Sequence, residues 1–546
     1  MIKYIIPIFL LFSSFAHASS ILPKQSAVAS AHPLATKAGI DILNQGGNAF
    51  DAAAAVALTI GVAEPVGSGI GGGGFFLLYI AKQDRYVMID ARETSPKLAG
   101  NGDVYKTQSS IDGPQSAGVP GLIAGVDHLI KKYGKLNREA DAKHAIQIAS
   151  HGFKVSKHYQ RVARWRKEVL ANNAAATIYL KKGDVPALGD VIKQPELAKT
   201  LVRFTKHGAN DFYRGETAKR LVKDMKRDGG FIRAEDLKAY KVIEREPERF
   251  THQGYEWISA ALPSSGGITL AETLGILAQD DLTSLPKPES THLIIEAMKL
   301  AYKDRNEHLG DSDFVTIPDL LNPERLKELR KNINKNQVAK ATTPTADPSG
   351  NGVDTTHFSI IDKEGNMVAA TLSINYGFGS GYVSPSTGLL LNDEMDDFAT
   401  QVGKPNAYGL VQGKANAVAP SKRMLSSMSP TFILGNDRTL IVGTPGGSRI
   451  ISMVLLAGLG FESGLGNPSD WINAPRFHHQ YLPDVVQHEQ GAFDPELKQA
   501  LEKKGHQFKE MRNYGNMHAI VWDKASGVVT GVSDQRGEGI SLYSTP

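Results

Sequence analysis

The stretch that decides the fold is TTHFSIIDKEGNMVAATLS, which runs from Thr355 to Ser373. Residues 355–361 are rich in β-forming side chains, a pattern that is typical of a strand. Residues 362–366 have the composition of a hairpin turn, and residues 367–373 have the pattern of a return strand. The stretch therefore predicts an antiparallel strand pair in which Thr355 is the first residue of the first strand.

The segment before this hairpin has a different character. Lys331–Asp354 has few apolar residues and many Lys, Asn, Thr, Pro and Gly, which predicts an exposed, mobile linker. A cut between Asp354 and Thr355 would place a free α-amine beside the Thr355 hydroxyl. Such an amine, with an ordinary pKa of about 7.7–8.0, can accept the hydroxyl proton near neutral pH. A threonine that opens a strand is usually only structural, so the spacing alone leaves both interpretations open.

Upstream, the sequence predicts two helices, a glycine-rich turn and two strands. Leu34–Leu43 and the Ala-rich Phe50–Val62 have helical character, and Phe75–Tyr79 and Tyr86–Ile89 have strand character. Between them, residues 67–74 read GSGIGGGG and match the dinucleotide-binding fingerprint. The match lacks its structural context, because these glycines follow a helix and precede a strand. A simple backbone turn, or close packing beside an active site, are the other interpretations.

The rest of the chain alternates between helical and strand-rich regions. Residues 118–329 are predicted to be mainly helical. Two short strands are predicted at Thr431–Leu434 and Leu440–Gly443, and a core helix at Ile450–Phe461. No later apolar run reaches the roughly 20 residues that a membrane span requires.

Composition narrows the class of protein. The chain has 546 residues, of which 41% are hydrophobic and 22% charged, which is typical of a globular protein. Its length alone predicts three or four domains, unless the fold is one large intertwined unit. A formal net charge of +4 gives no electrostatic case for nucleic-acid binding. The absence of cysteine excludes disulfides, thiol nucleophiles and Cys-ligated metals.

The first residues have the organisation of a signal peptide. Lys3 is followed by the largely apolar Tyr4–Phe15, and Ala16-His17-Ala18 matches a cleavage site. The apolar part is too short for a membrane anchor. We therefore expect residues 1–18 to be removed and the mature protein to be exported to the periplasm or secreted.

Metal and cofactor signals are weak. His478 and His479 are adjacent, so on a strand they would point to opposite faces. The acidic run Asn392–Asp397 lacks the spacing and the turn glycine of an EF-hand. The sequence predicts neither a metal nor a cofactor.

Nine short segments occur in an order and at a spacing that point to one family. They are Gly71–Phe75, Arg92-Glu93, Gly118–Gly121, Pro263–Gly267, Thr355–His357, Asn392–Phe398, Leu425–Thr431, Pro445–Arg449 and Asn473–His478. Together they resemble γ-glutamyltransferase (γ-glutamyltranspeptidase), a family of N-terminal-nucleophile hydrolases, over nearly the whole mature chain.

The resemblance implies an α/β (α+β) fold, a four-layer αββα sandwich formed jointly by two autoproteolytic fragments. Cleavage at Asp354-Thr355 would give a large subunit, residues 19–354, and a small subunit, residues 355–546, which stay together as a heterodimer. The implied activity is transfer of a γ-glutamyl group from glutathione or other γ-glutamyl compounds to water or to an amino acid or peptide acceptor.

The resemblance also assigns roles to residues. Thr355 is the nucleophile, Ser373 its hydrogen-bonding neighbour, and the N–H groups of Gly446 and Gly447 form the oxyanion hole. The substrate-binding residues that it implies are Arg92 and the hydroxyls of Ser426 and Ser427 for the donor α-carboxylate, and Asn375, Glu394 and Asp397 for its ammonium group. Residues 402–412 resemble a lid loop in which Tyr408 is an aromatic gate. The family often has Thr where this chain has Ser373, so the methyl group that fixes the side-chain rotamer is missing.

Two other functions remain open at this stage. One is a related cephalosporin (glutaryl) acylase, against which the amino-acid-binding set argues. The other is an exported binding protein that is never cleaved.

Overall fold

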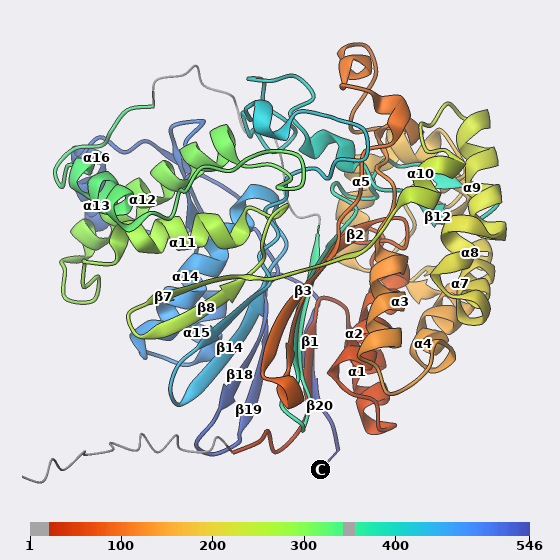
Figure 1. The fold of residues 1–546 in the computed structure, drawn as a ribbon, viewed down its shortest axis with the longest axis horizontal. Helices are drawn as coiled ribbons and strands as arrows, with labels where there is room; N and C mark the ends of the chain where they lie inside the picture. Colours follow the sequence, from red (N-terminus) through yellow and green to blue (C-terminus); the bar gives the residue numbers. More distant parts are fainter. Residues whose placement is uncertain (1–20, 342–354, 546) are drawn as a thin grey trace, which may run out of the picture.

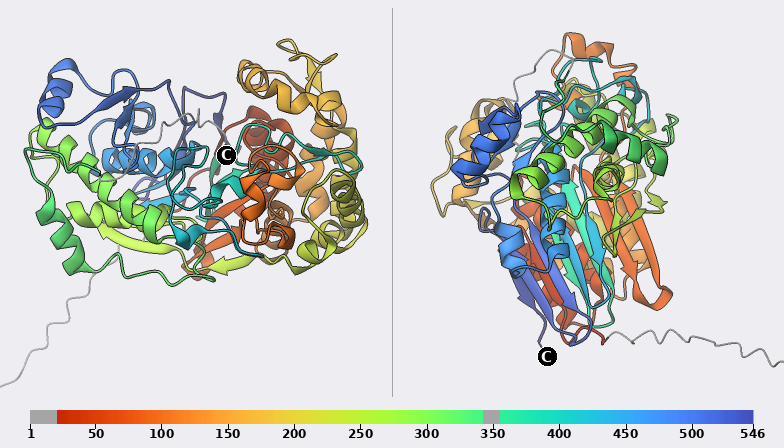
Figure 2. Two further views of the ribbon diagram at one scale, coloured as in Figure 1. Left: turned by 90° about the horizontal axis from the view of Figure 1, so that it is seen from above. Right: turned by 90° about the vertical axis from the view of Figure 1, so that its left-hand side faces the viewer.

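The computed structural model describes residues 21–341 and 355–545. The predicted signal peptide at residues 1–18 and the predicted cleavage residue Asp354 lie outside these ranges. Two antiparallel sheets face each other, and each is covered by helices on its outer side, which confirms the predicted αββα sandwich (Figures 1 and 2).

The first sheet has seven strands in the order β20-β1-β9-β10-β2-β3-β6. Their bounds are β20 (Ile540–Tyr543), β1 (Ala27–Ser30), β9 (Thr356–Ile361), β10 (Met367–Ser373), β2 (Gly73–Ile80), β3 (Arg85–Ala91) and β6 (Ile243–Arg245). The predicted hairpin forms β9 and β10 in the middle of this sheet, where both strands are buried along their whole length. The two upstream strands are also confirmed, as β2 and β3.

The second sheet has six strands in the order β19-β18-β14-β13-β8-β7. Their bounds are β19 (Val529–Ser533), β18 (His518–Asp523), β14 (Arg438–Gly443), β13 (Thr431–Leu434), β8 (Tyr255–Ser259) and β7 (Glu248–His252). Side chains from both sheets form the core between them, among them Phe75, Leu77, Ile258, Phe432 and Ile441.

Helices form the two outer layers (Figure 1). The first sheet is covered by α1 (Pro33–Asn44), α2 (Ala49–Ala63), α3 (Leu122–Lys132) and α4 (Arg138–His151), with α5 (Lys157–Ala171) and α7–α10 (residues 195–239) beyond. The second sheet is covered by α11 (Gly266–Leu277), α12 (Lys287–His308) and α14 (Ile450–Ser463), with α13 (Pro323–Asn332), α15 (Pro468–Asn473) and α16 (Pro495–Lys503) nearby. The predicted helices at 34–43, 50–62 and 450–461 are α1, α2 and α14.

Segments on both sides of Thr355 contribute strands to each sheet. In the first sheet, β1 lies between β20 and β9, and β10 pairs with β2. In the second sheet, β13 pairs with β8. The chain therefore forms one intertwined unit rather than three or four domains in a row.

Residues 118–329 are mainly helical, as predicted, but they also contain the short strands β4 (Phe153–Lys154), β5 (Val191–Ile192), β6, β7 and β8. The sequence patterns did not predict β6, β7 and β8. These strands are short and carry charged, partly exposed residues, so the sequence shows little of the expected alternation.

The linker prediction is only partly right. Most of residues 331–341 are exposed, but three backbone N–H groups anchor this segment. Ala339 donates to Glu296 at 3.1 Å, Ala341 donates to Asp484 at 2.8 Å, and Val338 donates to the carbonyl of Lys504 at 2.9 Å. The described part of the linker is therefore tied to α12 and to the segments around residues 484 and 504, and it is not a loose tether.

Candidate active site

Thr355 and Ser373 lie at the same end of the central hairpin. Thr356 pairs with Leu372 across β9 and β10, so the residues just beyond this pair face each other. The Thr355 Oγ1 and Ser373 Oγ atoms are 3.2 Å apart, and Ser373 Oγ also accepts the N–H of Asn375 at 2.8 Å. Because that N–H occupies a lone pair of Ser373, the Ser373 hydroxyl can donate its own proton to Thr355 Oγ1.

The glycine run packs directly against this pair. A Cβ atom on Gly67 would lie 2.9 Å from the Thr355 carbonyl oxygen, and one on Gly72 would lie 2.2 Å from the Ser373 carbonyl oxygen. Side chains at these positions would push the hairpin end away. Of the interpretations left open by the sequence, close packing beside the site is the one that the structure supports.

Two glycines form the loop that leads into α14. Gly446 (φ 141°) precedes and Gly447 (φ 59°) begins a short 3-10 turn, Gly447–Arg449, that continues into α14. Within residues 21–341 and 355–545, no acceptor takes up the N–H of either glycine. Unpaired N–H groups at the start of a helix attract negative charge, so this loop can stabilise an oxyanion.

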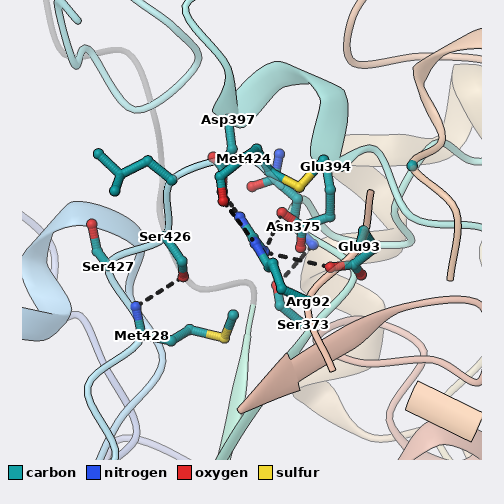
Figure 3. Close-up of polar contacts among 12 residues, drawn as sticks. Arg92, Glu93, Ser373, Asn375, Glu394, Asp397, Met424, Ser426, Ser427 and Met428 are labelled. Carbon is teal, nitrogen blue, oxygen red and sulfur yellow. Dashed lines mark hydrogen bonds and ion pairs between the residues drawn. The ribbon is translucent and has the colours of Figure 1, made fainter. Parts of the chain in front are cut away.

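Arg92 follows β3 and is held by carboxylates (Figure 3). Its Nη1 lies 2.6 Å from Glu394 and 3.7 Å from Glu93, and its Nη2 lies 2.5 Å from Asp397. Its Nε donates to the Met424 carbonyl at 3.3 Å. The side chains of Arg92, Glu93 and Glu394 are almost fully buried, whereas Asp397 is 17% exposed and reaches the pocket.

Burial and charge shift the pKa values in this cluster. Burial raises the pKa of Glu93 to about 7 and raises that of Glu394 well above its ordinary value, although Arg92 opposes both shifts. Burial alone would lower the pKa of Arg92, but its ion pairs with Glu394 and Asp397 outweigh burial and raise it. Three carboxyls around one guanidinium make this side of the pocket acidic.

The serine pair lies on a different loop from the acids (Figure 3). Ser426 Oγ accepts the Met428 N–H at 3.1 Å, and Ser427 Oγ accepts Nη2 of Arg305 at 2.8 Å. Each oxygen therefore already accepts a bond, which leaves its O–H free to donate to a ligand.

Tyr408 covers the pocket. Its hydroxyl donates to the Asn375 carbonyl at 3.3 Å, and its ring lies 5.3 Å from the ring of Tyr376. A Cβ on Gly447 would lie 2.5 Å from this ring. The aromatic ring thus rests directly on the glycine loop.

One pocket contains nine of the eleven residues that the resemblance places in the site. They are Arg92, Thr355, Ser373, Asn375, Asp397, Tyr408, Ser426, Ser427 and Gly447. Glu394 lies behind Arg92, and Gly446 lies next to the pocket wall. Side chains of the acidic run 392–397 bind different partners: Asn392 accepts the Gly118 N–H, and Asp393 accepts the Tyr376 N–H. In the described ranges, no group of three or more His, Asp or Glu side chains is arranged to hold a metal.

The sequence patterns did not identify Arg305, which also lines the pocket. It lies on α12 one helical turn after the buried Ala301 and Tyr302, and it is itself 1% exposed. An arginine on an otherwise apolar helix face is the signal that could have identified it.

Comparisons with known proteins identify the family of the chain. The family model described as Gamma-glutamyltranspeptidase matches residues 35–544. The chain is 39% identical to a glutathione hydrolase proenzyme of Escherichia coli, covering 94% of this chain and 90% of that protein. It is 38% identical to a protein of the same name from Pseudomonas sp., covering 92% and 91%.

Solved structures also resemble the chain. A cephalosporin acylase from Bacillus halodurans superposes with a TM-score of 0.84 at 27% identity, covering 99% of this chain and 98% of that one. A gamma-glutamyltranspeptidase chain from Helicobacter pylori has a TM-score of 0.55 at 35% identity, covering 57% of this chain and 92% of that one. No helix in the described part of the chain is long and apolar enough to cross a membrane. The resemblance seen in the sequence is thus confirmed, and the chain belongs to the gamma-glutamyltranspeptidase family of N-terminal-nucleophile hydrolases.

Proposed function

We propose that the chain cuts itself between Asp354 and Thr355 and then acts as a glutathione hydrolase and γ-glutamyltransferase. The observation that carries this proposal is that Thr355 shares one pocket with Arg92, Asp397 and the serine pair. A nucleophile, a cation and an anion in one pocket match a γ-glutamyl amide, which presents a carbonyl, an α-carboxylate and an α-ammonium group.

Self-cleavage follows from the position of Thr355. Its Oγ1 attacks the Asp354 carbonyl carbon, and the peptide C–N bond breaks as a C–O ester bond forms, which frees the Thr355 α-amine. Water then hydrolyses the ester, which gives an Asp354 carboxylate and restores the hydroxyl. The two fragments, residues 19–354 and 355–546, remain together because strands from both pair in each sheet.

Catalytic turnover also uses Thr355 Oγ1 as the nucleophile. The free α-amine takes the hydroxyl proton as Thr355 Oγ1 attacks the γ-carbonyl of the donor, and it then gives that proton to the departing amine. The N–H groups of Gly446 and Gly447 stabilise the tetrahedral oxyanion. Water or the amino group of an acceptor then takes the γ-glutamyl group from Thr355.

Donor recognition divides between two sides of the pocket. Asp397 and the side-chain oxygen of Asn375 attract the ammonium group, and the hydroxyls of Ser426 and Ser427 donate to the carboxylate. Arg92 supplies positive charge while it holds Asp397 in place. The signal peptide expected at residues 1–18 supports a periplasmic location, where the donors are external γ-glutamyl compounds.

The test compares the wild-type protein with Thr355→Ala. We expect the wild type to give two fragments on a denaturing gel, with the smaller one beginning at Thr355, and to turn over γ-glutamyl-p-nitroanilide. Thr355→Ala should stay a single chain without activity. A small fragment with any other first residue would remove Thr355 from the mechanism.

A second candidate is a glutaryl acylase, which the likeness to the Bacillus halodurans cephalosporin acylase favours. A glutaryl group keeps the distal carboxylate but lacks the ammonium group, so it has no partner for Asp397. We therefore expect glutaryl-7-aminocephalosporanic acid to be a much poorer substrate than γ-glutamyl-p-nitroanilide. A preference for the glutaryl compound would make the acylase the better assignment.

A further inference from the structure

Arg305 is a buried cation in the pocket wall whose hydrogen-bond partners are all neutral. Its Nη2 donates to Ser427 Oγ at 2.8 Å, its Nε donates to Ser265 Oγ at 2.9 Å, and its Nη1 donates to Asn306 Oδ1 at 3.0 Å. Its side chain is almost completely buried on α12. These three bonds fix the guanidinium plane and leave Nη2 next to the serine that lines the pocket.

The two arginines of the pocket differ in charge balance. Arg92 has three carboxylates within ion-pair distance. Among the described residues, no carboxylate lies within ion-pair distance of Arg305, and Asp397 acts on it only from farther away. Burial lowers the pKa of Arg305 from its ordinary value, but an arginine stays charged in proteins.

A buried charge without an ionic partner is costly to the folded protein. Such a charge is stabilised when an anion binds beside it, because the pocket then supplies the missing partner. Arg305 and Ser427 both line the pocket, so an anion that accepts the Ser427 hydroxyl lies close to the guanidinium. The α-carboxylate of a γ-glutamyl donor has the charge for this position, and it can accept the Ser427 O–H that Arg305 orients.

We propose that Arg305 is a specificity-determining residue that selects donors with an α-carboxylate, acting through Ser427 and through its own charge in the pocket wall. The guanidinium of Arg305 on α12 thereby adds to the positive charge that Arg92 supplies in the same pocket. This inference rests on the proposed function, because it concerns the donor that Thr355 attacks.

The test uses two substrates that differ only in this carboxylate. γ-Glutamyl-p-nitroanilide carries it, and 4-aminobutyryl-p-nitroanilide has the same chain and amino group without it. In Arg305→Met we expect kcat/KM for the γ-glutamyl substrate to fall about 10- to 100-fold, mainly through KM, with less than about a threefold change for the 4-aminobutyryl substrate. Arg305→Lys keeps the charge but loses the planar set of bonds, so it should fall between wild type and Arg305→Met.

Lys303→Met is the matched control, because it removes one positive charge from the exposed face of the same helix. It should behave as wild type with both substrates. Equal losses for both substrates in Arg305→Met, or no loss for either, would overturn the inference, since the first is the signature of a structural role. If Arg305→Met is not cleaved, Arg305→Lys decides by the same comparison, and absence of cleavage in both variants also overturns it.

These outcomes are separable from failure of the proposed function. A wild-type protein that is not cleaved at Thr355, or that does not turn over γ-glutamyl-p-nitroanilide, would refute the proposed function. A wild-type protein that passes both tests while Arg305→Met loses both substrates equally would refute only the role of Arg305.

Discussion

The floor and the roof of the pocket are built in different ways. The floor consists of Thr355 and Ser373, at the ends of two strands that are hydrogen-bonded on both sides in the middle of a sheet. The roof is the loop 399–412, which carries Tyr408. Side chains hold it at a few points: Tyr376 donates to the Ala407 carbonyl at 2.8 Å, and Gln480 donates to the Tyr408 carbonyl at 3.3 Å.

Because of this difference, the floor determines the rate of the chemical step and the roof determines which molecules enter the pocket. A strand end inside a sheet cannot move without breaking its ladder, so the floor keeps the nucleophile and its neighbour at a fixed distance. A loop held by side chains can open without unfolding anything else. We therefore expect floor variants to lower the rate of the chemical step, and roof variants to change what enters the pocket.

The largest effect should come from the nucleophile itself. Replacing Thr355 by Ala removes the attacking oxygen, so turnover should fall by about 10⁴-fold or more. Thr355→Ser is the matched variant, because it keeps the hydroxyl and loses only the methyl group. It should still be cleaved and active, and an inactive Thr355→Ser protein together with an active Thr355→Ala protein would contradict the assignment.

The contact between the roof and Gly447, in the loop that leads into α14, should give the second largest effect. An alanine there adopts an unfavourable positive φ, and its Cβ would lie 2.5 Å from the Tyr408 ring. Displacement of one oxyanion donor typically costs about 10²–10³ in rate, so we expect kcat of Gly447→Ala to fall about 100-fold.

Gly403→Ala is the control for backbone strain, because Gly403 also has a positive φ (79°) but has nothing within 4 Å of the added Cβ. It should lower kcat far less than Gly447→Ala. Equal losses in the two variants would show that strain alone, and not the displaced N–H or the Tyr408 ring, is responsible.

A smaller effect is expected at Ser373. Removal of its hydroxyl in Ser373→Ala takes one hydrogen bond from Thr355 Oγ1, which corresponds to about a three- to tenfold loss in kcat. Ser373→Thr keeps the hydroxyl and adds the methyl group that restricts its rotamer, so its kcat should equal or exceed that of wild type. A Ser373→Thr protein slower than Ser373→Ala would show that the 3.2 Å contact does not assist the reaction.

Local patterns were enough to predict the floor, because a hairpin is encoded by adjacent residues. The bounds of β9 and β10 differ little from the predicted ones. Contacts between distant segments were not accessible in this way. The bond from Arg305 to Ser427 joins residues 122 positions apart, and the anchors of Ala339 and Ala341 come from side chains 43 and 143 positions away. From the sequence alone, polar residues of this kind cannot be distinguished from surface residues, because their hydrogen-bond partners are distant along the chain.

The roof should respond more weakly to the loss of Tyr408. Tyr408→Ala removes the ring that covers Gly447, which admits water to the acyl-enzyme. We expect hydrolysis of γ-glutamyl-p-nitroanilide to stay within about threefold of wild type, while the ratio of transfer to hydrolysis with a dipeptide acceptor falls severalfold. Val402→Ala, at an exposed position of the same loop, should leave the ratio unchanged. A fall in hydrolysis comparable to that of Gly447→Ala would mean that the roof takes part in the chemical step.

The smallest effect should be a pH dependence of roof closure, set by Asp396. Its carboxylate accepts the Ala407 N–H from the roof at 3.0 Å and the Ser110 hydroxyl at 2.7 Å. Burial raises its pKa to about 6, so the closed form binds a proton more tightly than an open form in which the carboxyl is hydrated. The proton on Asp396 therefore stabilises the closed form of the roof. This stabilisation is at its full value below the ordinary pKa of about 3.9, and it is lost as the pH rises through about 6.

Trp165 can report this transition, because its ring lies 5.4 Å from that of Tyr376, which in turn contacts Tyr408. We expect tryptophan fluorescence to change between pH 5 and 7 with a midpoint near 6 in the wild type, and to stay flat in Asp396→Asn, which cannot ionise. Asp103→Asn removes an exposed carboxylate and should keep the wild-type midpoint. The same midpoint in Asp396→Asn would mean that a group other than Asp396 controls the roof.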